Sequence, residues 1–266
     1  MKLGIYNNIN GFLAGGLLVS LFIFGPSGCR QPELVAEALP QPLLRIERTA
    51  GLDSSMERYI LPYREQLQQR LQEVVAVLET EATKGRPEST LGNLVCDVLL
   101  REAAPFADTI SIKAPLVVLM NHGGLRAPLP RGPVNVGHLY ELMPFENRLT
   151  AVLISADSIS GLIRYIITKN GEPVSGLRLV LGKNLEESGC WIQDRPCKQW
   201  PALWIITSDY LADGGDRMAF LRNPLRRYDL GLTVREALIQ GLRKWGAEGP
   251  LKPSTDGRIT IISTGP

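Results

Sequence analysis

Histidine is scarce in this chain, which holds only His122 and His138 among its 266 residues. A two-metal phosphoesterase centre needs many His, Asp and Asn ligands to hold its ions about 3.5–4 Å apart. The sequence also lacks an HExxH segment, a CxxC pair, a GxSxG elbow and a P-loop. We therefore expect no catalytic residue, no metal site and no cofactor in this chain, and no hydrolysis of phosphate esters by the two-metal route.

An excess of charge of one sign is also missing, because 29 basic residues are balanced by 27 acidic ones. No block of Lys and Arg with interleaved aromatic residues occurs, so a surface for a nucleic-acid polymer is not expected. Hydrophobic residues make up 44% of the chain, which is ordinary for a globular protein and excludes a disordered or collagen-like chain. A chain of 266 residues is long enough for one domain with a sizeable core.

The one long apolar run lies near the N-terminus, where residues 11–25 read GFLAGGLLVSLFIFG. It is shorter than the roughly 20 residues that a membrane-spanning helix needs. Lys2 is the only charged residue before Arg30. We therefore predict that residues 1–28 are a secretory signal peptide.

The sequence PSGC that follows the run resembles a bacterial lipoprotein signal, in which the cysteine, here Cys29, becomes the lipidated first residue. Pro26 departs from the usual aliphatic residue, so an uncleaved anchor with an incidental cysteine is the alternative. Either interpretation places the protein outside the cytoplasm and attached to a membrane, in the periplasm or at the outer membrane. Residues 29–53 contain three prolines and are predicted to be an extended tether, followed by a domain at residues 54–266.

Two of the four cysteines, Cys190 and Cys197, have six residues between them in the segment CWIQDRPC. Outside the cytoplasm, a disulfide that closes this loop is the simplest interpretation. A zinc site is the alternative, although no histidine lies near. Cys96 falls in a predicted helix and is expected to be a buried thiol.

Hydrophobic periodicity predicts a series of helices and strands. The first helix is predicted from Glu57 to about Leu78, although its last part, VVAVLE, could equally be a strand. Ser89 is expected to cap the next helix, and Asn170 with Gly171 to end a later one. Helices are predicted at residues 89–104, 134–144, 158–171 and 232–246, and strands at residues 116–121, 148–155 (alternating), 175–182, 202–208 and 257–263. This order indicates the fold class α/β (α+β), with a mixed β-sheet flanked by helices.

The strand predicted at residues 116–121 ends in the turn MNHGGLR. Glycines let a backbone come close to a ligand, and the guanidinium of Arg126 suits phosphate oxygens. Taken alone, the turn could equally be a glycine turn with a surface arginine.

Four loop segments together resemble the C-terminal, substrate-binding domain of the 5'-nucleotidase family. They are STLGNLVCDVL, NHGGLRAPLPRGPVNVGHLYELMPFENRL, VSGLRL and SDYLADGGDRM, in the order and with the spacing typical of that domain, and the resemblance covers residues 57–263. Family members usually carry an N-terminal metallophosphoesterase domain with the metal ligands, whereas this chain has a signal peptide and a tether there. The resemblance therefore implies that divalent metals are held only by a catalytic partner.

The resemblance also implies roles for single residues. Asn121 and Arg126 would hold the ribose and the phosphate, because they match the NGGGIR turn of the family. His122 replaces a family glycine and is expected to face solvent. Arg86 lies where the family often has a phosphate-directed arginine, with an ordinary solvated charge as the alternative. Gly176 matches a glycine that lines the base pocket, with a plain turn glycine as the alternative.

Two aromatic residues complete the implied site. Phe145 and Tyr210 would clamp the nucleobase between them, and Asn147 would contact its edge. Asp216 would hold the ribose hydroxyls. Tyrosine replaces the usual phenylalanine at position 210 and still offers a flat face for stacking. A packing role in the core is the alternative for either aromatic residue.

The sequence supports three functional hypotheses. The first is a lipid-anchored domain that binds a nucleotide or nucleoside, as the substrate-recognition half of a 5'-nucleotidase in extracytoplasmic nucleotide catabolism. Its catalytic half would be a separate metallophosphoesterase chain. The second is a phosphoester hydrolase whose active site is not located, and the third is a scaffold that keeps the fold without binding a ligand.

The predicted anchor can be tested separately from the domain. Cys29→Ser should abolish membrane association and leave the fold unchanged, because the tether separates Cys29 from the domain. Fractionation of membranes, with circular dichroism of the variant, measures both outcomes. Unchanged partitioning into the membrane would support an uncleaved helix instead.

Overall fold

A computed structural model describes residues 53–182, 184 and 186–262 of the chain. The predicted signal peptide, Cys29 and residues 29–52 of the tether lie outside the described residues. Asp53, the last residue assigned to the tether, caps the first helix by accepting hydrogen bonds from the backbone N–H groups of Ser55 and Met56. Within the part that the structure describes, none of the helices has both the length and the apolar character needed to cross a membrane.

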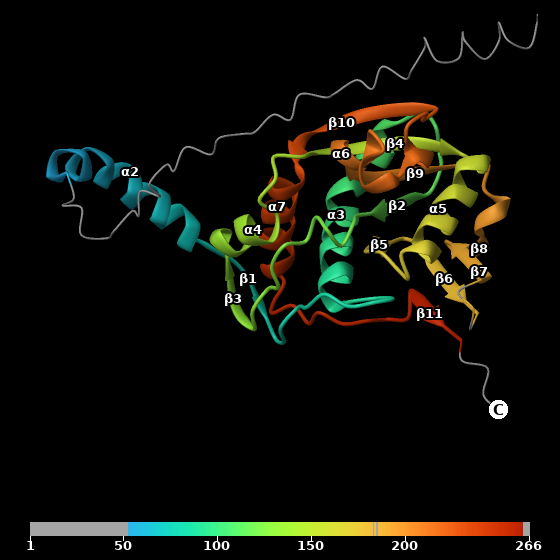
Figure 1. The fold of residues 1–266 in the computed structure, drawn as a ribbon, viewed down its shortest axis with the longest axis horizontal. Helices are drawn as coiled ribbons and strands as arrows, with labels where there is room; N and C mark the ends of the chain where they lie inside the picture. Colours follow the sequence, from blue (N-terminus) through green and yellow to red (C-terminus); the bar gives the residue numbers. More distant parts are fainter. Residues whose placement is uncertain (1–52, 183, 185, 263–266) are drawn as a thin grey trace, which may run out of the picture. The chain divides into compact units, whose positions relative to one another are not determined.

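A mixed sheet of five strands organises the domain and confirms the predicted fold class (Figure 1). Its strand order is β10-β4-β9-β2-β5, where the strands are β10 (Arg226–Thr233), β4 (Arg148–Ser155), β9 (Ala202–Ser208), β2 (Leu116–Leu119) and β5 (Val174–Ser175). The central strand β9 pairs parallel with β2 and antiparallel with β4. The outer strands β10 and β5 are both antiparallel to their neighbours.

Side chains of the central strands alternate between two hydrophobic cores. Trp204 and Ile206 of β9 face the first core, which α3 (Thr90–Thr109) and α7 (Val234–Gly246) also line. Leu203 and Ile205 face the second core, together with α5 (Ala156–Thr168). Because both faces of the sheet are covered, every residue from 149 to 154 in β4 is buried. The predicted alternation of buried and exposed residues along this strand is therefore wrong.

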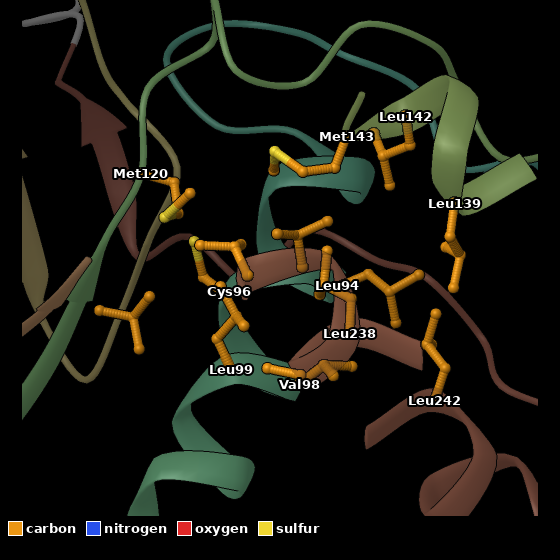
Figure 2. Packing of buried hydrophobic residues seen from close by; sticks show 14 of the residues in the cluster. Leu94, Cys96, Val98, Leu99, Met120, Leu139, Leu142, Met143, Leu238 and Leu242 are labelled. Carbon is orange, nitrogen blue, oxygen red and sulfur yellow. The ribbon is translucent and has the colours of Figure 1, made fainter. Parts of the chain in front are cut away.

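The two helices of the first core pack closely against each other (Figure 2). Leu94, Val98 and Leu99 of α3 are buried against Leu238 and Leu242 of α7. At the crossing, a Cβ atom on Gly241 would lie 2.5 Å from Cγ1 of Val98, so glycine allows this close approach. The predicted cap of α3 is confirmed, because the Ser89 side chain accepts a hydrogen bond of 3.0 Å from the N–H of Gly92.

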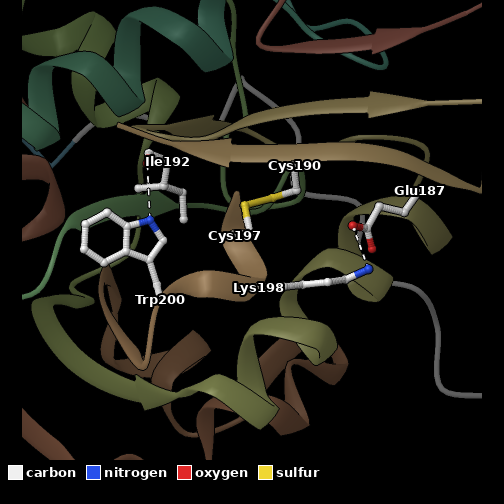
Figure 3. Close-up of a disulfide and its surroundings, with 6 residues drawn as sticks. All are labelled: Glu187, Cys190, Ile192, Cys197, Lys198 and Trp200. Atoms are coloured by element: carbon white, nitrogen blue, oxygen red, sulfur yellow. Dashed lines mark hydrogen bonds and ion pairs between the residues drawn. A yellow bond between two sulfur atoms is a disulfide. The ribbon is translucent and has the colours of Figure 1, made fainter. Parts of the chain in front are cut away.

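A second sheet carries the predicted disulfide. Its strand order is β11-β6-β7-β8, where the strands are β11 (Ile259–Ile261), β6 (Arg178–Leu181), β7 (Glu187–Ile192) and β8 (Arg195–Pro196). Cys190 and Cys197 are bonded, with their Cα atoms 5.3 Å apart, which confirms the disulfide (Figure 3). Trp200 beside the bridge donates a hydrogen bond of 3.2 Å from Nε1 to the carbonyl of Ile192. Cys96 is a buried free thiol, as expected.

The first predicted helix, α2 (Ser54–Gln72), ends before the run VVAVL, which confirms the alternative of a strand there. That run forms β1 (Val74–Leu78), which pairs with β3 (Gly132–Asn135) and buries Val75 and Leu78. β-Branched residues favour a strand where a partner strand is available. The strand that β1 pairs with was not predicted, and neither was β10. The helix α4 (Val136–Leu142), which follows β3, was predicted.

The helix α2 contributes little to the core, where only its partly buried Leu71 packs, although its apolar stripe was predicted to be the face of an amphipathic helix. It has no buried residue, and Leu67 in the middle of the stripe is 57% exposed. Its C-terminal end contacts α4, where the N–H of Val136 donates a hydrogen bond of 2.9 Å to the carbonyl of Glu73.

Matched substitutions in α3 and α2 test this difference. Leu99→Ala should lower the free energy of unfolding by about 2–5 kcal/mol, because Leu99 is fully buried in the first core. Leu67→Ala should change it by about 0.5 kcal/mol or less, because its side chain is exposed. Urea unfolding of both variants measures the difference, and equal losses would contradict this assignment of the core.

Candidate functional site

The topology of the central sheet brings three loops to one edge. Strands β2 and β9 are parallel, so their carboxyl ends lie at the same edge, and the antiparallel strand β4 begins there. The loops after β2, before β4 and after β9 enclose a pocket of about 360 Å³. Its lining residues are Asn121, Gly123, Gly124, Phe145, Asn147, Tyr210 and Asp216. The crevice beyond the carboxyl ends of strands is where ligands commonly bind in such sheets.

Five of the eight predicted binding residues meet in this pocket: Asn121, Phe145, Asn147, Tyr210 and Asp216. They come from segments as far apart as 95 positions, the separation of Asn121 and Asp216.

The two aromatic side chains of the pocket are exposed, which excludes the alternative that both pack in the core. Phe145 is 41% exposed and Tyr210 is 52% exposed. The Tyr210 ring lies over Gly215, where a Cβ atom would be 2.5 Å from Cζ of the ring. Its hydroxyl accepts a hydrogen bond of 3.2 Å from the N–H of Asp216. Tyr210 and Asp216 are therefore held as one unit.

An arginine of α7 that was not predicted as a site residue holds the loop of Phe145. Arg235 is 4% exposed and donates hydrogen bonds to the carbonyls of Met143 (3.0 Å) and Phe145 (3.2 Å). It also pairs with Glu146, and its guanidinium lies 4.0 Å from the ring centroid of Tyr140. A buried guanidinium with several acceptors restrains the backbone that carries Phe145.

Asp216 lies at the centre of a polar network. Its carboxylate accepts hydrogen bonds from Lys169 Nζ to Oδ1 (2.9 Å) and from Asn121 Nδ2 to Oδ2 (3.1 Å). The Tyr165 hydroxyl donates to its backbone carbonyl at 3.2 Å. Burial alone would raise the pKa of Asp216, but the bonds from Lys169 and Asn121 and the lysine charge outweigh it, so the pKa lies below its ordinary value. Lys169 and Tyr165 were not predicted as site residues.

The glycines of the turn after β2 give space to Asn121. A Cβ atom on Gly124 would lie 2.7 Å from Asn121 Oδ1, and one on Gly123 would lie 3.2 Å from Nδ2. The N–H of Gly124 also donates to the carbonyl of Asn121 at 3.0 Å. The turn therefore folds back under the asparagine side chain and presents it to Asp216.

Two predicted arginines lie outside the pocket lining. Arg126 is exposed on the same turn, and its guanidinium donates a long hydrogen bond of 3.4 Å to the carbonyl of Gly123. Arg86 donates to the carbonyls of Lys169 and Gly171, and lies 3.8 Å from the Glu172 carboxylate. Arg86 is itself exposed, so these contacts hold a side chain that still meets solvent.

Gly176 is not brought to the pocket. It lines a separate cavity of about 640 Å³ next to Trp191 and Arg258. Its φ is +79°, and a Cβ atom would lie 2.5 Å from the carbonyl oxygen of Leu116. The arrangement supports the alternative of a turn glycine.

The prediction that His122 faces solvent is wrong. Its side chain is half-buried, and Nε2 is enclosed without a hydrogen-bond partner among the described residues. Burial, together with the charges of Arg86 and Lys84, lowers the pKa of His122 to about 4. Its backbone N–H donates to Glu172 at 2.8 Å, and burial raises the pKa of that carboxyl.

The second histidine has a structural role. His138 Nδ1 accepts a hydrogen bond of 3.1 Å from the N–H of Asn135 in the capping box of α4. Over residues 53–182, 184 and 186–262, no group of three or more His, Cys, Asp and Glu side chains is placed to hold a metal ion.

Known proteins resemble this chain in sequence and in fold. The 5'-nucleotidase of Diplobatis ommata is 22% identical over 204 residues, which are 69% of this chain and 35% of the relative. The apyrase of Tabanus yao is 25% identical over 201 residues, which are 66% of this chain and 35% of the relative. The chain thus spans about a third of the length of these relatives.

Among solved structures, a 5'-nucleotidase precursor from Thermus thermophilus has the same fold. The TM-score is 0.65 at 23% identity, over 79% of this chain and 43% of the other. The family described as "5'-nucleotidase, C-terminal domain" matches residues 73–222, which are more than half of the 266 residues. The resemblance predicted from the four loop segments is thus confirmed, and the chain belongs to the 5'-nucleotidase C-terminal domain family.

Proposed function

We propose that this domain binds a nucleotide or nucleoside, as the substrate-recognition half of a 5'-nucleotidase. The observation that carries the proposal is the pocket in which Phe145 and Tyr210 are both exposed beside the carboxylate of Asp216. Two aromatic side chains that are left half-exposed in one pocket suit a flat ligand, because base stacking on an aromatic ring contributes about 1–3 kcal/mol.

The polar groups of the pocket suit the rest of a nucleotide. Asp216 and Asn121 provide an acceptor and an amide for sugar hydroxyls, and Asn147 lies in the pocket to contact the edge of the base. Arg126, exposed on the same turn as Asn121, is the candidate for the phosphate, because guanidinium groups bind phosphate oxygens in a forked geometry. Arg86 is already bonded to backbone carbonyls, and we assign it a supporting role behind the phosphate position.

The proposed catalytic half is a separate metallophosphoesterase chain that holds the divalent metals. It would act with this domain outside the cytoplasm, where the domain is held at the membrane by a lipid on Cys29. Together they would serve in the breakdown of nucleotides.

The aromatic clamp is tested by truncating each ring. Phe145→Ala and Tyr210→Ala should each weaken binding of AMP by about 1–3 kcal/mol, because each removes one stacking face. Calorimetric titration measures the loss. Tyr63→Ala is the matched control, because Tyr63 is a 63% exposed aromatic residue on α2 that does not line the pocket.

Thermal unfolding separates binding from packing in these variants. Because both side chains are exposed, neither truncation should approach the cost of about 3–5 kcal/mol that deletion of a buried aromatic has. A double variant that stays folded and binds AMP as tightly as the parent protein would rule out the clamp.

An activity assay tests the proposal that this chain binds the substrate and that a separate chain hydrolyses it. The purified protein should release no phosphate from AMP, with or without Mg²⁺, Mn²⁺ or Zn²⁺, because its two histidines are too few to build a two-metal centre. A colorimetric phosphate assay measures this, with a known 5'-nucleotidase as the positive control. Metal-stimulated release by a preparation free of other phosphatases would support the hydrolase alternative.

A further inference from the structure

Lys169 reaches the pocket from the end of α5. It follows Thr168, the last residue of that helix, and the chain then turns through Asn170 and Gly171, whose φ values are 52° and 94°. Nζ of Lys169 lies 2.9 Å from Oδ1 of Asp216, and the two side chains are only 29% and 28% exposed. This ion pair is partly shielded from water, so it is worth more than a fully solvated pair.

The backbone of Lys169 is itself restrained. The Arg86 guanidinium donates to the carbonyls of Lys169 and Gly171, on either side of Asn170. Gly171 also packs against the loop of Arg86, because a Cβ atom there would lie 1.9 Å from the carbonyl oxygen of Pro87. The Lys169 ammonium lies 5.4 Å from the ring centroid of Tyr165, a favourable cation–π distance. The lysine is therefore directed at Asp216 from a fixed turn.

Asp216 needs such support because its backbone is unusual. Its φ is 49°, a left-handed conformation that few non-glycine residues adopt. Its N–H is bonded to the Tyr210 hydroxyl and its carbonyl to the Tyr165 hydroxyl. Its position therefore depends on α5 as well as on the aromatic clamp.

The carboxylate keeps free acceptor positions despite these bonds. Each of its oxygens accepts one hydrogen bond, from Lys169 at Oδ1 and from Asn121 at Oδ2. An ionised carboxylate has about four lone-pair sites, so each oxygen can accept another donor. Two adjacent hydroxyl groups provide two such donors, whereas a protonated carboxyl group would replace one acceptor with a donor.

We propose that Lys169 is a positioning residue that holds the Asp216 carboxylate for the two hydroxyls of a ribose, so that the pocket selects ligands with a vicinal diol. The ligand in this inference rests on the proposed function, whereas the effect of Lys169 on Asp216 does not. The two parts are tested separately.

The first test needs no ligand. The groups that face Asp216 are Lys169 just after α5, the Tyr165 hydroxyl from α5, Asn121 from the turn after β2 and the Tyr210 hydroxyl from α6 (Asp209–Ala212). The Glu172 carboxylate is also close enough to interact with the charges of Asp216 and Lys169. Carbon-detected NMR of the full chain should give a higher pKa for Asp216 in Lys169→Met than in the parent, because burial is then opposed less. Lys169→Arg should keep it low.

Lys198→Met is the matched control for the titration, because Lys198 pairs with Glu187 at 3.2 Å near the disulfide (Figure 3) and does not line the pocket. It should leave the pKa of Asp216 as in the parent. An unchanged pKa of Asp216 in Lys169→Met would overturn the positioning role, whatever the protein binds.

The second test compares adenosine with 2',3'-dideoxyadenosine by calorimetry. Lys169→Met should weaken adenosine binding by about tenfold or more, the loss expected for a charge-assisted contact, and leave dideoxyadenosine within about twofold. As pH is lowered, the variant should begin to lose adenosine at a higher pH than the parent, because its Asp216 protonates earlier. Lys169→Arg should restore the preference for adenosine.

Each other outcome of this comparison decides against part of the inference. Equal losses of both nucleosides would mean that Lys169 only supports the fold, and would overturn diol selection. A parent protein that binds both nucleosides equally would do the same. A parent protein that binds neither would contradict the proposed function and the choice of ligand, while the titration still decides whether Lys169 controls Asp216.

Discussion

The pairing of β9 with β2 on one side and with β4 on the other is the constraint on which the rest of the structure depends. Alternate residues of β9 face two different cores, so α3 and α7 cover one face of the sheet and α5 covers the other. The same pairing, parallel on one side and antiparallel on the other, brings three loops to one edge. The pairing of β9 with its two neighbours therefore determines both the packing of the two cores and the position of the pocket.

The helices that form the cores also position the pocket. Arg235 of α7 holds the loop of Phe145, and Lys169, just after α5, holds Asp216. One aromatic side chain and the carboxylate are therefore tied to opposite faces of the sheet. Because helices on both faces of the sheet restrain these side chains, a pocket that is made of loops can still have a well-defined geometry.

Local patterns predicted much of this arrangement. The residues of the pocket stand in short loop motifs, and five of them could be identified because the four motifs together resemble one family. Lys169 could not be found in this way, because it contacts a residue 47 positions away and no motif surrounds it. Arg235 could not be predicted for the same reason, because it contacts the carbonyl of Phe145 from 90 positions away.

The errors in the sequence analysis have a related cause. The run VVAVL after α2 has no local property that distinguishes a helix from a strand. It forms a strand because it pairs with β3. His122 was placed in solvent because it stands in a glycine turn, but the neighbouring Glu172 accepts from its backbone and keeps it inside. Gly176 matched a family motif, but in the structure it allows the close approach of the Leu116 carbonyl. In each case a distant part of the chain set the outcome.

The central claim, that a nucleobase lies between Phe145 and Tyr210, is tested most directly by intermolecular nuclear Overhauser effects in a complex with adenosine. We predict contacts from the H2 and H8 protons of adenine to the ring protons of both residues. Contacts to Trp191 in the larger cavity, with none to Phe145 and Tyr210, would contradict it.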